Sequence, residues 1–146
     1  MAAMLPQRLG TPLHPAPAAP PAQRTFGSSP ETARAAREYV REVVNLADPP
    51  FALDRVSDLQ LVTSELVTNA VRYGTEPGDS ILVTVSTGPR HVRVEVHDPT
   101  RRRPRRRPDS DERARGRGLF VVEALARSWG VDDRPMGKVV WAVISW

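Results

Sequence analysis

The spacing of apolar residues changes after Tyr73, and the change limits the folds that this chain can adopt. Between Asp54 and Tyr73 apolar residues recur every three or four positions, which is typical of a helix with one buried face. After the turn-rich segment GTEPGDS the spacing falls to two, first over residues 81–86 and again over 92–97. Because TGPR joins these two short runs, they predict an antiparallel hairpin with one buried face.

Three further segments complete the predicted fold. SSPETARAAREYVREVVNLA predicts a first helix, since Ser29 can cap it, Pro30 suits its first position and Glu31 complements its dipole. GLFVVEALARSWG leaves little polar face and predicts a largely buried helix, and Trp129–Asp132 and KVVWAVISW predict two more strands. This order indicates an α+β fold, a two-layer sandwich in which a mixed, mostly antiparallel sheet is covered on one face by three helices.

Composition limits the domain count and the cellular setting. With 146 residues, the chain is long enough for one domain with a core and too short for two of ordinary size. Residues 1–24 are rich in alanine and proline and predict a disordered tail, which leaves a domain over 25–146. The absence of cysteine excludes disulfides and thiolate metal sites. Prolines interrupt the N-terminal apolar residues that a secretory signal would need, so we expect a cytoplasmic protein.

The net charge of +4 comes from one segment. Six arginines lie in RRRPRRRP, from Arg101 to Arg107, and without them the rest of the chain carries a net charge of −2. Such a run is most often a solvated segment and less often a phosphate-binding patch. Nucleic-acid binding through this run is one hypothesis, but no aromatic residues interleave it for base stacking.

Three separated motifs carry the residues that could form a site. Glu65 and Asn69 lie four positions apart at the edge of the apolar arc of helix 54–73, so they point the same way from successive turns. Asp98 ends the hairpin, and Gly116 and Gly118 precede the third helix, whose first amides an anion can approach closely. Taken singly, each motif has an ordinary explanation, such as a polar helix edge or a turn-forming aspartate. Their order and spacing are more informative than any one of them.

In that order and spacing, SELVTNAVRYG, the strand-end aspartate and the glycine pair resemble the small ATP-binding domain shared by gyrase-type ATPases, histidine kinases and MutL-type repair proteins. Within this GHKL family, which has the Bergerat fold, the chain from about Thr25 to Trp146 is similar to the anti-sigma-factor serine/threonine kinases of bacteria. The resemblance implies ATP and Mg²⁺ as cofactors. An alternative with the same fold is a module that keeps the nucleotide pocket and regulates a partner by sequestration alone.

The resemblance also implies roles for particular residues. Asn69 would hold the Mg²⁺ that bridges the triphosphate, and Glu65 would position or deprotonate the attacking hydroxyl. Asp98 would accept a hydrogen bond from the exocyclic amine of adenine. The segment Arg101–Arg115 occupies the position of a lid, and the glycine pair would offer backbone amides to the phosphates. The further nucleotide-binding residues implied are Thr100, Arg115, Gly116, Arg117, Gly118 and Leu119.

One position departs from the family pattern. The family often shows Asp-x-Gly after the adenine-binding strand, whereas this sequence reads Asp98-Pro99-Thr100. Thr100 can replace the glycine only if the turn does not require a positive φ. The resemblance implies a sigma factor, an anti-sigma-factor antagonist with a phosphorylatable serine, or both in competition, as partners. Homodimers are also common in the family.

Overall fold

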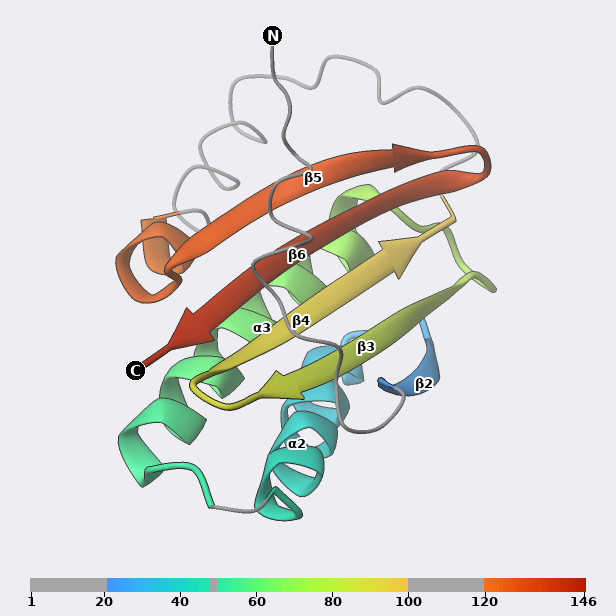
Figure 1. Cartoon of the computed structure of the whole chain (residues 1–146). Helices are drawn as coiled ribbons and strands as arrows, with labels where there is room; N and C mark the ends of the chain where they lie inside the picture. The colour runs from blue at the N-terminus through green and yellow to red at the C-terminus, as the bar shows by residue number, and fades with distance from the viewer. Residues whose placement is uncertain (1–20, 48–49, 100–119) are drawn as a thin grey trace, which may run out of the picture.

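The protein is built on one five-stranded sheet. The computed structural model describes residues 21–47, 50–99 and 120–146. Its strands are ordered β2-β3-β4-β6-β5, and each hydrogen-bonded pair is antiparallel (Figure 1). The bounds are β2 (Ala22–Gly27), β3 (Ser80–Gly88), β4 (His91–Asp98), β5 (Ser128–Arg134) and β6 (Gly137–Ser145). The sheet that was expected to be mixed therefore contains no parallel pair among its described strands.

The helices lie together on one face of this sheet, which Figure 1 shows behind the strands. They are α2 (Thr32–Asn45), α3 (Leu53–Tyr73) and a third helix whose described residues are 120–125. The predicted α+β layering and the helix over residues 54–73 are confirmed. None of the helices in the described ranges is both long and apolar enough to cross a membrane.

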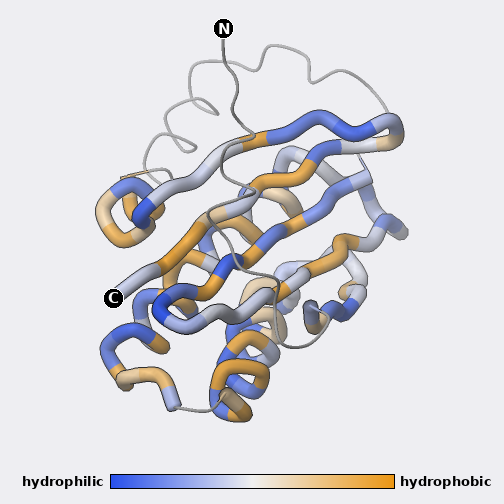
Figure 2. The backbone as a smooth tube through the Cα atoms, in the orientation of Figure 1, coloured by the Kyte–Doolittle hydropathy of each residue, from blue (hydrophilic) through white to orange (hydrophobic). Residues whose placement is uncertain are grey.

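The core forms where the alternating strands face the helices. Figure 2 shows apolar and polar residues alternating along β4, as expected for a strand with one buried side. Side chains from β3, β4 and β6 meet those of α2 and α3, and the largest fully buried ones include Leu59, Leu66, Ile81, Val94 and Ile144. Burial of these side chains fixes which face of each strand points toward the helices, because a shift of one residue would turn every side chain to the other face.

Strand β2 differs from the sequence prediction. The tail was predicted to extend through residue 24, but the structure begins β2 at Ala22 and pairs it with β3. The guanidinium carbon of Arg24 lies 4.4 Å from the ring centroid of Tyr39 on α2, and the Phe26 ring packs edge-on against the same ring at 5.9 Å. Burial raises the pKa of Tyr39, which Arg24 opposes and the nearby Glu42 reinforces. Arg24 and Phe26 thus attach the edge strand β2 to α2 through Tyr39. The hydropathy of the sequence alone does not reveal this strand.

Two helix predictions also need correction. Helix α2 begins at Thr32 and not at Pro30, and the Thr32 hydroxyl donates to the Gly27 carbonyl and accepts from the Ser29 amide. The third helix was predicted to be largely buried, but within 120–125 only Val122 is buried, and Phe120 is 73% exposed. This segment therefore carries more apolar side chains than the rest of the domain buries.

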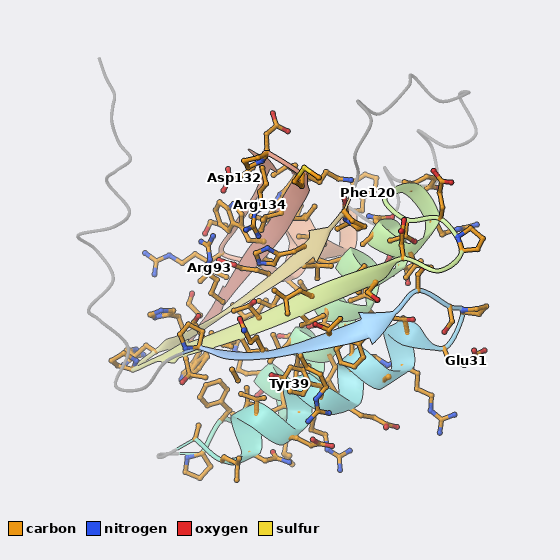
Figure 3. All side chains as sticks on the ribbon, turned by 90° about the vertical axis from the view of Figure 1, so that its right-hand side faces the viewer. Glu31, Tyr39, Arg93, Phe120, Asp132 and Arg134 are labelled. Carbon is orange, nitrogen blue, oxygen red and sulfur yellow. The ribbon has the colours of Figure 1, made fainter. Side chains whose placement is uncertain are left out.

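The sheet face opposite α2 and α3 carries paired charges. The Arg93 guanidinium lies 4.3 Å from the Trp141 ring centroid, and its Nε donates to Glu95 at 2.8 Å. The other Glu95 oxygen lies 3.0 Å from His97 Nε2, and Arg134 contacts His97 Nδ1. Figure 3 shows Arg93 and Arg134 on the side of the sheet away from Tyr39. On this face, Arg93 therefore contacts Trp141 and Glu95, and Arg134 contacts His97.

Candidate functional site

Helix α3 presents Glu65 and Asn69 at the edge of its buried face. The helix buries Val62, Leu66 and Ala70, while Glu65 and Asn69 are half-buried beside them. Their spacing of four residues places the carboxylate and the carboxamide on successive turns. Both residues therefore lie on the predicted helix, and both side chains are partly exposed.

The Asp98 carboxylate lies against the end of α3. Asp98 is the last residue of β4, on the same side of the strand as the buried Val94 and Val96, and it is 5% exposed. Gly74 ends α3, where its amide donates to the Ala70 carbonyl at 2.8 Å. A Cβ atom on Gly74 would lie 2.4 Å from Asp98 Oδ2. The strand end and the helix end therefore meet at a contact that only glycine allows.

This contact places the three candidate residues in order along α3. Asn69 lies five residues before Gly74, or about 7.5 Å along a helix axis, and Glu65 lies nine residues before it, or about 13.5 Å. Asp98 therefore lies at the end of α3, and Asn69 and then Glu65 follow toward the start of the helix.

Strand β6 adds two residues that the sequence analysis did not select. Lys138 pairs with Asp98 in the β4–β6 register, and its Nζ lies 2.7 Å from Asp98 Oδ2, as an ion pair rather than an aligned hydrogen bond. The neighbouring Gly137 packs on the Asp98 backbone, since a Cβ there would lie 1.9 Å from the Asp98 carbonyl oxygen. The sequence did contain one feature that could have drawn attention to Lys138, because it is the only lysine in the sequence.

The other predicted nucleotide-binding residues lie outside the described residues. They are Thr100, Arg115, Gly116, Arg117, Gly118 and Leu119, together with the lid segment and the arginine run within it. Within the described ranges, no group of three or more His, Cys, Asp or Glu side chains is placed to hold a metal ion. Asn69 still fits Mg²⁺, because this ion commonly takes one or two protein oxygens and completes its shell with phosphate and water.

An open pocket of about 520 Å³ lies between the start of α2 and the end of α3. Its lining includes Pro30, Ala33 and Val71, but not Glu65, Asn69 or Asp98. Two of its hydroxyls, on Ser28 and Thr75, bond to each other at 2.6 Å. This pocket is therefore separate from the site along α3.

Comparison with known proteins identifies the domain. No curated protein matches the chain. Among solved structures, the histidine kinase domain of a blue-light activated histidine kinase from Erythrobacter litoralis is 19% identical, with a TM-score of 0.48, and the match covers 77% of this chain and 60% of that one. Residues 26–144 match the model of a protein family described as the histidine kinase-like ATPase domain. Because this match spans most of the sequence and includes Glu65, Asn69 and Asp98, the chain belongs to the histidine kinase-like ATPase domain family.

Proposed function

We propose that this protein binds Mg·ATP and transfers the γ-phosphate to a serine of an antagonist protein, and that it regulates transcription by partner switching with a sigma factor. Domains of its family bind ATP, usually with Mg²⁺. The observation that carries the proposal is the contact between Gly74 and Asp98, which brings a buried carboxylate to the end of the helix that bears Asn69 and Glu65.

Asp98 recognises the base in this proposal. An ionised carboxylate only accepts hydrogen bonds, so it suits the exocyclic amine of adenine. Its burial strengthens the discrimination, because a buried acceptor left without a donor loses its hydration as well as its partner. Gly74 leaves room for the carboxylate at the end of α3, because a Cβ there would lie 2.4 Å from Asp98 Oδ2.

Asn69 and Glu65 act further along the helix. Asn69 would hold Mg²⁺, which when bound neutralises charge on the phosphate oxygens. Glu65 accepts the proton of the serine hydroxyl while the hydroxyl oxygen bonds to the γ-phosphorus. The bond between that phosphorus and the β,γ-bridging oxygen breaks, and ADP leaves.

Replacing Asp98 with asparagine is expected to weaken ATP binding by about 5- to 150-fold, which corresponds to about 1–3 kcal/mol for a buried hydrogen bond. The substitution keeps the shape but removes the charge, and it adds a donor that repels the base amine. Calorimetric titration with Mg·ATP measures the change. Asp54→Asn removes the same charge in the exposed first turn of α3 and should bind ATP as the parent does. Equal affinities of the Asp98 variant and the parent would remove Asp98 from the site.

Phosphoryl transfer is tested with labelled ATP and candidate antagonist proteins that carry an acceptor serine. We expect label to appear on the serine and to depend on Mg²⁺. A protein that binds Mg·ATP and a sigma factor but labels no candidate would be a sequestering module, and the kinase proposal would fail. This outcome separates the two functions because binding alone is common to both.

A further inference from the structure

Lys138 is an unusual cation in this protein. Every other member of the 21 lysine and arginine residues is an arginine. The Lys138 side chain is only 17% exposed, and its ammonium lies 2.7 Å from a carboxylate whose side chain is 1% exposed. The β4–β6 register places the two residues side by side at the end of the sheet. Lys138 is therefore built into the location that the proposed function assigns to the base.

The ion pair opposes the cost of burying the Asp98 carboxylate. Burial disfavours a charged carboxylate unless a nearby opposite charge compensates it. Without the ammonium, this buried charge would lose its compensating cation, and the side chain would turn toward solvent and no longer present a fixed acceptor to the base. Gly74 packs on the same carboxylate, so the end of the helix and the Lys138 ammonium hold it together.

We propose that Lys138 is a positioning residue that determines base specificity by holding the Asp98 carboxylate in place as a fixed acceptor, so that the site selects a purine with an amine at position 6. This inference rests on the proposed ATP binding and adds the group that makes it selective. A purine with a carbonyl at position 6 would place a second acceptor against the carboxylate, and a purine without a substituent there would offer no donor.

The test compares two nucleotides that differ only at position 6. ATP and purine riboside triphosphate, which lacks the amine, are titrated by calorimetry into the parent, Lys138→Met and Lys138→Arg. The parent should prefer ATP by about 10-fold or more, as expected for one buried hydrogen bond. Lys138→Met should reduce this preference to less than about 3-fold with little change for the analogue, and Lys138→Arg should retain it because the charge is kept. Arg127→Met, which removes an exposed cation near β5, is the matched control and should keep the parent's preference.

Folding is monitored in parallel, because an uncompensated buried charge destabilises a protein. If Lys138→Met does not fold, Lys138→Gln removes the charge but keeps a polar side chain, and it should show the same reduced preference. An unchanged preference in the folded variant, or an equal loss of affinity for both nucleotides, would overturn this role. If the parent binds neither nucleotide, the proposed function fails and this role with it. If the Lys138 variant binds ATP and keeps the parent's preference for ATP over the analogue, only the role of Lys138 is refuted and the proposed function stands.

Discussion

A Glu65→Gln variant is expected to transfer phosphate about 10²- to 10⁴-fold more slowly than the parent while binding ATP almost as well. Glutamine keeps the size and the hydrogen-bonding reach of the side chain but cannot accept a proton from the acceptor hydroxyl. Glu65 lies about two and a half turns of α3 from the Asp98 contact, so its loss should leave recognition of the base intact. Single-turnover transfer to a serine-bearing antagonist measures the rate, and calorimetry measures the affinity.

Two further variants make this result specific. Glu38→Gln neutralises an exposed glutamate of α2 that pairs with Arg34, and it should leave the transfer rate unchanged. Asn69→Ala should give a different pattern, in which the Mg²⁺ dependence of ATP binding is lost together with transfer. If the Glu65 variant transfers phosphate at the parental rate, Glu65 is not the base.

Gly137→Ala is expected to destabilise the protein by about 1–3 kcal/mol and to abolish measurable ATP binding. The added methyl group would lie 1.9 Å from the backbone carbonyl oxygen of Asp98. Because that atom belongs to the main chain of β4, it can move only if the end of the β4–β6 pairing opens, and this displaces the Asp98 side chain. Denaturant unfolding measures the stability, and titration with Mg·ATP measures the binding.

Gly27→Ala is the matched control for this substitution. A Cβ on Gly27, the last residue of β2, would meet no atom within 4 Å. We expect its stability and its ATP affinity to remain close to those of the parent. Equal effects of the two substitutions would mean that the contact between Gly137 and Asp98 does not maintain the site.

The elements with strong periodicity could be predicted from the sequence. Helix α3 and the β3–β4 hairpin were placed to within a few residues because their apolar spacing depends only on near neighbours. Strand β2 was not found, since its attachment depends on Arg24 and Phe26 reaching Tyr39 on another element. The exposure of Phe120 was not foreseen either, because composition does not reveal how much of a helix its neighbours will cover.

The same distinction applies to the candidate site. Glu65 and Asn69 are four positions apart on one helix, so their spacing was visible in the sequence. Gly137 and Lys138 reach Asp98 only through the pairing of β4 with β6, and no local pattern indicates that register. Local motifs thus indicated the helix side of the site, while its strand side required the structure.

The β4–β6 pairing also has a consequence for the kinetics of folding. Asp98 and Lys138 are 40 positions apart, because position 138 pairs with position 98. Closing so long a segment costs chain entropy before any contact forms, so distant strand pairings slow folding and tend to be completed late. Contacts that are absent from the folding transition state affect the unfolding rate more than the folding rate. A nucleotide held at Asp98 would therefore lengthen the lifetime of the folded chain without making it fold faster.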